Sequence, residues 1–395
     1  MQSNREVVIL SAVRTAIGSF GGSLKNIRPA ELGAMVAKEA IKRAGIDAST
    51  VESCVIGNIL RSEARDVYVS RLIALEGGLP IESHAVTVNR LCGSGLEAIV
   101  NATQQIQTGE VTTAIAGGAE SMSMATYSVQ SNRWGQRMGN STMEDDMNAA
   151  LHDPFGTGHM GVTAENLSEK FDISRDQQDE YAALSHQRAI NAIEQGYFKE
   201  QIMPVEIKSR KGVTVFDTDE HPRDGVTAES LNGLKTIFKD NGTVTAGNAS
   251  GLNDGASMLV LMEGEAAKAQ NLKPLARVIS YARAGVEPSI MGIGPVPAVK
   301  LALKRAGLTI DDLDVIESNE AFAAQACSVS KDMEFPADKT NPNGGAIALG
   351  HPIGASGAII TTKLIYELKR VNGRYGVATL CIGGGQGIAM VVEVL

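Results

Sequence analysis

The residues best suited to chemistry begin with Cys92, in the segment Leu91-Cys92-Gly93-Ser94-Gly95. Glycines permit a sharp turn that leaves the sulfur uncovered, and a helix-like run follows them. The free N–H groups and the dipole at a helix N-terminus favour a thiolate and can also stabilise an oxyanion. A cysteine is often only a small buried hydrophobe. The glycines and the helix start make a nucleophile the better interpretation of Cys92.

A second candidate is His351, which stands between Gly350 and Pro352 just before another helix start. A histidine held in this way can act as the base that takes the proton from sulfur. The alternative is a first helix turn in which the imidazole only fills space.

Two further segments could contribute. Cys381 ends the last buried strand and precedes a glycine run that includes Gly383, so a second thiol there could move protons at carbon. The run lacks the spacing of a phosphate-binding loop. The pair Asn319-Glu320 follows another buried strand, where it could cap the next helix, hold a water molecule or orient His351.

An internal duplication relates the elements that must position these residues. Residues 37–58 align without gaps to residues 299–320, an offset of 299 − 37 = 262. Each copy has the pattern of a half-buried helix closed by glycine and followed by a short β-branched strand. The same offset carries Ser94-Gly95 onto Ser356-Gly357. The two helix starts are therefore equivalent, and pseudo-symmetry could bring the Cys92 and His351 loops into one cleft.

The duplication predicts two related α/β halves, with an insertion in the first. The first half comprises residues 1–120 and 251–272, the insertion residues 121–250, and the second half residues 273–395. Alternating helix and strand patterns predict mostly parallel sheets covered by helices. The insertion matches neither half and contains a helical stretch near residues 176–194. Long insertions of this kind often grip substrate.

Composition and charge argue against several classes of protein. The net charge is −9 and no basic stripe is present, so we expect no nucleic-acid partner. No apolar run approaches the roughly 20 residues that span a bilayer, and neither a signal-peptide nor a peroxisomal pattern occurs. A cytoplasmic protein with no membrane partner is expected. The four cysteines include no Cys-x-x-Cys pair, and no metal or prosthetic group is expected.

Taken together, these segments resemble the thiolase family. Cys-Gly-Ser-Gly, Asn-Glu-Ala-Phe, Gly-His-Pro and Cys-x-Gly-Gly-Gly occur in family order and at family spacing, and the similarity extends from Val7 to Glu393. The resemblance implies a duplicated fold of five-layer α/β/α/β/α halves with a loop domain inserted in the first. It also implies acyl-CoA and CoA as the ligands, no cofactor, and assembly as a homodimer or homotetramer.

The resemblance also assigns roles. Cys92 attacks an acyl-CoA with His351 as base, and Cys381 removes a proton from the methyl carbon of a second acetyl-CoA. The carbanion then attacks the acyl group on Cys92 in a Claisen condensation that yields a 3-ketoacyl-CoA, and thiolysis is the reverse. Backbone N–H groups of Cys92 and Gly383 would form one oxyanion site. His351 and a water held by Asn319 would form the other.

The resemblance places coenzyme A binding mainly in the insertion. The matching residues are Leu151, His159, Met160, Arg223, Ser230, Phe238, Ala246, Ser250, Ala321 and Phe322. Arg223 could pair with a phosphate or stack on adenine, whereas Leu151, Phe238 and Ala246 could equally be ordinary core. The pair His159-Met160 resembles that of short-chain biosynthetic thiolases, in which the methionine crowds the pocket.

Three departures from the family pattern bear on the substrate: Arg90, Ser318 and Ile359. They are closer to broad-specificity β-ketothiolases that also accept propionyl-CoA. The main prediction is therefore condensation of acetyl-CoA with itself or another short acyl-CoA. The alternatives are a degradative thiolase of longer chains, a ketoacyl synthase, which has no need of Cys381, and a thiolase-like protein without catalysis.

Overall fold

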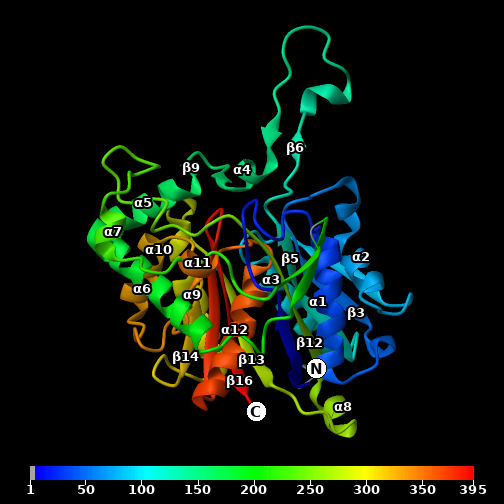
Figure 1. The fold of residues 1–395 in the computed structure, drawn as a ribbon. Helices are drawn as coiled ribbons and strands as arrows, with labels where there is room; N and C mark the ends of the chain where they lie inside the picture. Colours follow the sequence, from blue (N-terminus) through cyan, green and yellow to red (C-terminus); the bar gives the residue numbers. More distant parts are fainter. Residues whose placement is uncertain (1–4, 211) are drawn as a thin grey trace.

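One continuous mixed sheet runs through the protein (Figure 1). The computed structural model describes residues 5–210 and 212–395. Ten strands form the sheet, in the order β14-β15-β16-β13-β1-β12-β5-β3-β4, with β2 paired to β12. These strands are β1 (Val7–Arg14), β2 (Gly18–Ser19), β3 (Ser53–Gly57), β4 (His84–Val88), β5 (Thr113–Ser121), β12 (Asn253–Glu263), β13 (Ala276–Gly285), β14 (Val315–Ser318), β15 (Tyr375–Ile382) and β16 (Gln386–Val394).

Helices account for most of the remaining regular structure. They are α1 (Pro29–Ala44), α2 (Val69–Glu76), α3 (Ser94–Thr108), α4 (Asp146–Ala150), α5 (Met160–Phe171), α6 (Arg175–Glu194), α7 (Ala228–Asn232), α8 (Gly264–Ala269), α9 (Pro295–Ala306), α10 (Ala323–Met333), α11 (Ala346–Leu349) and α12 (Ser356–Val371). Short 3₁₀ turns are η1 (Ala48–Thr50), η2 (Ala64–Tyr68), η3 (Gln130–Arg133) and η4 (Pro288–Ile293). None of the described helices is long and apolar enough to cross a membrane.

Most strand pairs in the sheet are antiparallel, so the expectation of mostly parallel sheets is wrong. Among the described strands of this sheet, the parallel pairs are β3–β4, β3–β5 and β14–β15. The central strands are buried on both faces, because helices cover the sheet on both sides. Such strands appear as continuous apolar runs in either direction, so burial patterns do not reveal how they pair.

The molecule as a whole has five alternating layers of helices and strands, and both halves contribute a helix to the central layer. Helices α1 and α2 pack on the outer face of the first half's strands. Helices α3 and α12 lie between the strands of the two halves, and α9 and α10 cover the outer face of the second half. The two sets of strands join where β1 pairs with β13. The shared central layer carries both candidate helix starts.

The predicted duplication is present in the fold. Helices α1 and α9 both end at a glycine in left-handed conformation, Gly45 with φ 68° and Gly307 with φ 69°. Strands β3 and β14 follow them, and α3 and α12 begin at the equivalent residues Ser94 and Ser356. The helix and the strand predicted in each copy are therefore equivalent elements of the fold.

The first turns of α3 and α12 approach each other closely through two glycines. A Cβ atom added to Gly95 would lie 2.8 Å from the Ala358 nitrogen, and one added to Gly357 would lie 2.3 Å from the Leu96 nitrogen. Any larger residue at these two positions would push the helices apart. This close contact between α3 and α12 holds the loop before α3 beside the loop before α12.

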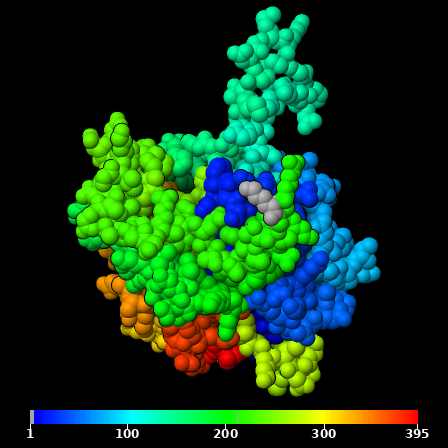
Figure 2. All heavy atoms as spheres, in the orientation of Figure 1, coloured from blue at the N-terminus to red at the C-terminus, as the bar shows by residue number. Residues whose placement is uncertain are grey.

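The insertion contains short elements and one long helix. Its strands are β6 (Tyr127–Ser128), β7 (Glu144–Asp145), β8 (His152–Asp153), β9 (Gly158–His159), β10 (Val205–Ser209) and β11 (Gly212–Phe216). The expected helix near residues 176–194 is α6. The segment between β6 and β7 projects away from the body of the molecule as an arm, clear in Figures 1 and 2. Its Trp134 side chain is 94% exposed.

Candidate active site

Cys92 lies in the turn between β4 and α3, next to a leucine in an unusual conformation. The backbone of Leu91 has φ 45°, a left-handed value that residues other than glycine and asparagine rarely adopt. Two hydrogen bonds hold the turn. Leu91 N–H donates to Asn89 Oδ1 at 3.0 Å, and Arg90 N–H donates to Ser94 Oγ at 2.8 Å. The turn is thus closed on itself and places the cysteine in the wall of an apolar pocket.

Cys92, His351 and Gly383 line one predominantly apolar pocket. Its space is about 480 Å³, the mouth included. Five residues predicted to bind coenzyme A also line it: Leu151, Met160, Ser250, Ala321 and Phe322. The remaining lining residues are Leu91, Ala150, Met291 and Ile353. The tertiary structure therefore brings the two helix-start loops and the insertion together around a single cavity.

The pKa of the Cys92 thiol lies above its usual value, although the helix start by itself favours a thiolate. The partly buried position of Cys92 raises the pKa of its thiol to about 11, and the Glu120 carboxyl contributes to this increase. The backbone N–H groups of Gly383 and of Cys92 itself act in the opposite direction. The sulfur loses its hydration, and two N–H groups compensate only part of that loss. Attack by this sulfur consequently needs a base.

His351 is placed to be that base. Its backbone N–H donates to Asn253 Oδ1 at 2.9 Å, and its Nδ1 lies 2.6 Å from Ser356 Oγ. Ser356 Oγ also lies 3.0 Å from the Pro352 carbonyl; when it donates its single hydrogen there, Nδ1 carries the imidazole proton and donates to Ser356. Burial lowers the pKa of His351 to about 4, so the ring is neutral near pH 7.

The unprotonated Nε2 of His351 is the atom left for chemistry. It is buried and makes no hydrogen bond within the described chain. A neutral imidazole with Nδ1 fixed as the donor presents a lone pair at Nε2. The ring can therefore accept a proton in the pocket and, once protonated there, donate a hydrogen bond.

Cys381 and Gly383 come from the hairpin of β15 and β16. Cys381 is fully buried opposite Gly387, in an apolar cluster with Met160, Ala321 and Phe322. It does not line the pocket of Cys92, but its environment depends on that residue. Burial raises the pKa of Cys381, and the charge that Cys92 can carry raises it further. Cys381 is a neutral thiol whose thiolate, once formed, is a strong base.

The pair Asn319-Glu320 does not cap the next helix, so that interpretation is wrong. Helix α10 has Phe322 at its N-cap and receives no side-chain hydrogen bond there. Glu320 instead accepts hydrogen bonds from Ser185 Oγ at 2.7 Å and Asn341 Nδ2 at 2.9 Å. Asn319 is buried, and neither polar atom of its side chain has a partner in the described chain. It lines a separate, smaller cavity beside Gly350 and Ser356.

Two further predicted coenzyme A residues, His159 and Phe238, join Phe322 of the pocket in an aromatic wall. The His159 ring stacks on Phe238 with centroids 4.6 Å apart and an interplanar angle of 16°. Phe238 in turn meets Phe322 edge to face at 6.3 Å. Phe238 is only half-buried, so this wall has a face open to a ligand.

Three other predicted coenzyme A residues, Arg223, Ser230 and Ala246, are exposed and do not line the pocket. Ser230 forms a capping box with Thr227 at the start of α7, where its N–H donates to Thr227 Oγ1 at 3.2 Å. The exposure of Ala246 shows that it is not part of the core. Contact of these three residues with coenzyme A stays a prediction.

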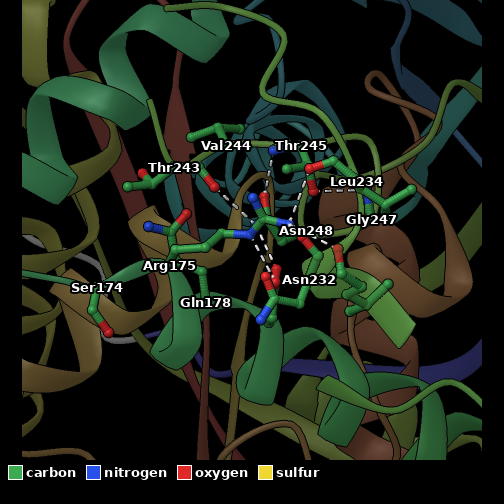
Figure 3. Close-up of polar contacts among 12 residues, drawn as sticks. Ser174, Arg175, Gln178, Asn232, Leu234, Thr243, Val244, Thr245, Gly247 and Asn248 are labelled. Carbon is green, nitrogen blue, oxygen red and sulfur yellow. Dashed lines mark hydrogen bonds and ion pairs between the residues drawn. The ribbon is translucent and has the colours of Figure 1, made fainter. Parts of the chain in front are cut away.

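Polar contacts hold the end of the insertion against α6 (Figure 3). Arg175 donates to three backbone carbonyls within residues 231–234, at 2.7 to 3.3 Å. The side-chain Nδ2 of Asn248 donates to the Thr243 carbonyl at 3.1 Å. The backbone carbonyl of Asn248 accepts from the Ala323 N–H at 2.8 Å. These contacts fix the segment that carries Ser250 to the start of α10, beside the pocket.

Sequence reasoning missed three residues that support the His351 loop. Ser356 sets the imidazole tautomer, and Asn253 binds the His351 backbone. Glu120 accepts a hydrogen bond from Gly354 N–H at 2.9 Å, and burial raises the pKa of this carboxyl to about 8. The position of Ser356, five residues after the histidine on a helix start, could have been recognised. Asn253 and Glu120 come from distant strands, and no local signal marks them.

The fold and site define a duplicated α/β protein in which a thiol and a neutral imidazole face one apolar pocket. Family models described as the thiolase N-terminal domain and the thiolase C-terminal domain match residues 7–265 and 272–394. The chain belongs to the thiolase family.

Curated proteins and solved structures resemble the chain over almost its whole length. It is 59% identical over 390 residues to beta-ketothiolase BktB of Cupriavidus necator, covering 98% of this chain and 99% of that one. An acetyl-CoA acetyltransferase from Bacillus anthracis superposes with a TM-score of 0.98 at 46% identity, covering all of both chains. Human mitochondrial 3-ketoacyl-CoA thiolase in complex with CoA superposes with a TM-score of 0.97 at 44% identity, covering 100% of this chain and 99% of that one.

Proposed function

We propose that this protein condenses acetyl-CoA reversibly with acetyl-CoA or another short acyl-CoA, giving a 3-ketoacyl-CoA and free CoA. The observation that carries the proposal is the meeting of the Cys92 thiol, the free Nε2 of His351 and the Gly383 backbone in one apolar pocket. The names of the similar proteins, beta-ketothiolase and acetyl-CoA acetyltransferase, support the same chemistry.

In the first half-reaction, Cys92 sulfur attacks the thioester carbonyl while His351 Nε2 takes the thiol proton. The thiol pKa of about 11 and the imidazole pKa of about 4 disfavour an ion pair at rest, so proton transfer accompanies formation of the carbon–sulfur bond. The N–H groups of Cys92 and Gly383 receive the oxyanion. The CoA sulfur leaves and takes its proton from Cys381, which produces free CoA and the Cys381 thiolate.

In the second half-reaction, the Cys381 thiolate removes a proton from the methyl carbon of acetyl-CoA. Burial makes this thiolate a strong base, which suits a weakly acidic carbon. The protonated His351 donates from Nε2 to the developing enolate oxygen, together with a water held by Asn319. The carbanion attacks the acyl carbon, and Cys92 sulfur leaves and recovers its proton from His351. All protons are then returned to their starting groups.

The nucleophile and the carbon base are tested separately. Cys92→Ala should abolish exchange of labelled CoA into acetyl-CoA, and retained exchange would show that another group carries the acyl chain. Cys381→Ser keeps a hydroxyl that can pass a proton to the leaving CoA sulfur, so it should retain measurable exchange, but it lacks the thiolate that acts at carbon and should lose condensation. Equal loss of both steps in Cys381→Ser would contradict its role at carbon.

The acyl group is expected to be short, because Met160 lines the pocket beside Cys92. A Cβ atom on Gly383 would come within 3.1 Å of Met160 Cε, which places the methionine against the hairpin turn. Steady-state kinetics with 3-ketoacyl-CoA substrates of increasing chain length test this expectation. A preference for chains beyond 3-ketohexanoyl-CoA would favour the degradative alternative.

The proposal includes a homodimer or homotetramer in the cytoplasm. The arm between β6 and β7 exposes the apolar side chains of Trp134 and Met138, which are 94% and 90% exposed and which a second chain could cover. Sedimentation velocity of the purified protein measures the assembly, and a monomer would contradict this part of the proposal.

A further inference from the structure

A small cavity, here called the chamber, lies beside the His351 loop and is distinct from the pocket of Cys92. Its walls come from the end of β14, from α11 with the Gly350 turn, and from the first turns of α12. The space open to the centre of a water molecule is about 20 Å³. A bound water needs about 10–15 Å³ by the same measure, so the chamber has room for one.

Buried polar atoms without partners gather in the walls of the chamber. Within the described chain, Glu317 Oε1, Ser318 Oγ and both polar side-chain atoms of Asn319 make no hydrogen bond. All three residues line the chamber and are at most 4% exposed. Each unsatisfied group of this kind costs about 1–3 kcal/mol, and a water in the chamber would remove that cost for several of them at once.

A buried ion pair closes one side of the chamber. Lys363 Nζ lies 2.9 Å from Glu317 Oε2 and donates to the Gly344 carbonyl at 2.6 Å. Both side chains are almost completely buried, and buried pairs contribute little net stability because desolvation offsets their attraction. Burial raises the pKa of Glu317 to about 7, and Lys363 acts against this increase. Glu367 and Glu320 are the other charged groups that act on Glu317, and both raise its pKa.

The pair connects the two elements that carry the second predicted oxyanion site. Lys363 belongs to α12, whose first residue, Ser356, holds the His351 ring. Glu317 belongs to β14, which leads directly into Asn319. The chamber lies between these elements, and the pair spans it. A water in the chamber therefore lies next to Asn319 and next to Ser356, the residue that holds the His351 ring.

We propose that the chamber is a bound-water site and that Glu317 and Lys363 are positioning residues that orient this water and, through it, the Asn319 amide. The inference rests on the proposed thiolase reaction. Lys363 Nζ, 2.9 Å away, favours the ionised form of Glu317. A carboxylate only accepts hydrogen bonds, so a water at Glu317 Oε1 donates to it. The second hydrogen of that water is available to Asn319 Oδ1. Asn319 Nδ2 then remains free to donate to the second water, the one that Asn319 holds for the developing enolate oxygen.

Glu317→Gln and Lys363→Met test the proposal. Each should lower kcat for condensation about tenfold, less than the 10²–10³-fold typical of losing a direct oxyanion donor. The KM for acetyl-CoA and the exchange of labelled CoA should stay within roughly twofold of the wild type, because the acyl-enzyme step uses the other oxyanion site. Lys300→Met is the matched control, since it breaks an exposed ion pair with Asp332 on the surface.

The double variant Glu317→Gln/Lys363→Met separates positioning from folding. It removes both charges, so stability to urea should return toward that of the wild type, whereas the condensation rate should stay low. Recovery of both would show that the pair is only structural and would overturn the proposal. A crystal structure that shows a dry chamber would also overturn it. If wild-type protein carried out CoA exchange but no condensation, the proposed function would fail instead, independently of these variants.

Discussion

The starts of α3 and α12 use the same serine in two different ways. Ser94 accepts from the Arg90 N–H and donates to the Leu91 carbonyl at 2.7 Å, so it shapes only the backbone before Cys92. Ser356, its equivalent, accepts from a side chain, the Nδ1 of His351, and donates to the Pro352 carbonyl. The duplicated scaffold supplies a hydroxyl at each helix start. The preceding loop decides whether that hydroxyl builds a turn or orients an imidazole.

The reactive residues themselves do not coincide under the duplication. The offset of 262 carries Cys92 onto Gly354 and His351 onto Asn89. Gly354 leaves no room for a side chain, because a Cβ atom there would lie 2.4 Å from Glu120 Oε2. At the two helix starts each half therefore contributes one reactive group, and the equivalent position in the other half supports the structure.

The largest expected effect separates His351 from its equivalent, Asn89. His351→Ala should lower kcat about 10²–10⁴-fold, the range for losing a general acid–base group. Asn89→Ala removes only the 3.0 Å hydrogen bond to Leu91 N–H, so it should cost about 1 kcal/mol of unfolding free energy. Steady-state kinetics and urea denaturation of both variants measure the contrast. Similar kinetic losses in the two would mean that His351 acts only through loop structure.

The crossing of the two helices is tested at Gly357. Gly357→Ala should destabilise the protein by about 3 kcal/mol, because the added methyl overlaps the backbone of α3. Gly233→Ala is the control, since a Cβ atom at that position meets nothing within 4 Å and its φ is −71°. Urea denaturation of both variants checks this prediction. An unchanged midpoint for Gly357→Ala would show that the helices tolerate a wider crossing.

The two serines form a matched pair for the next experiment. Ser356→Ala frees the His351 tautomer and should lower kcat about 10- to 100-fold with little loss of stability, by analogy with partners that orient metal-binding histidines. Ser94→Ala should instead cost about 1–3 kcal/mol of stability, because it leaves buried backbone groups without partners. Kinetics and denaturation of each variant are compared. An equal kinetic loss in both would remove the distinction between the two helix starts.

The smallest expected effect concerns pH. The pKa of His351 is lowered from its usual 6.5 to about 4, so the neutral ring persists well below pH 6. The acid limb of the CoA-exchange rate should therefore lie near pH 4, measured as kcat/KM in buffers of constant ionic strength. An acid limb at 6.5 would show that the ring is solvated.

The same shift predicts the sign of an effect on stability. Between about pH 4 and 6.5 the unfolded chain binds more protons at His351 than the folded chain does, so the stability contributed by this group is lost as the pH falls through that window. His186, whose pKa burial lowers to about 4, acts in the same direction.

Local patterns were sufficient for the elements and for much of the site. The period of apolar residues and the closing glycines predicted α1, α9 and the strands after them, because helix ends and amphipathic faces are encoded within a few residues. The four motifs located Cys92, His351, Asn319 and Cys381 at strand and helix ends for the same reason. Eight of the predicted site residues line the pocket of Cys92 in the structure.

Sequence by itself determined the duplicated helix–strand units, the two helix starts and the positions of Cys92 and His351 in the loops before them. Only the tertiary structure decided strand direction, the raised pKa of Cys92, and the contacts that Glu120, Asn253 and the Glu317–Lys363 pair make. The physical reason is that these properties depend on burial and on contacts between residues far apart in the chain. A thiol at a helix start has a low pKa only if water or enough N–H groups reach it, and that is decided by everything packed around it.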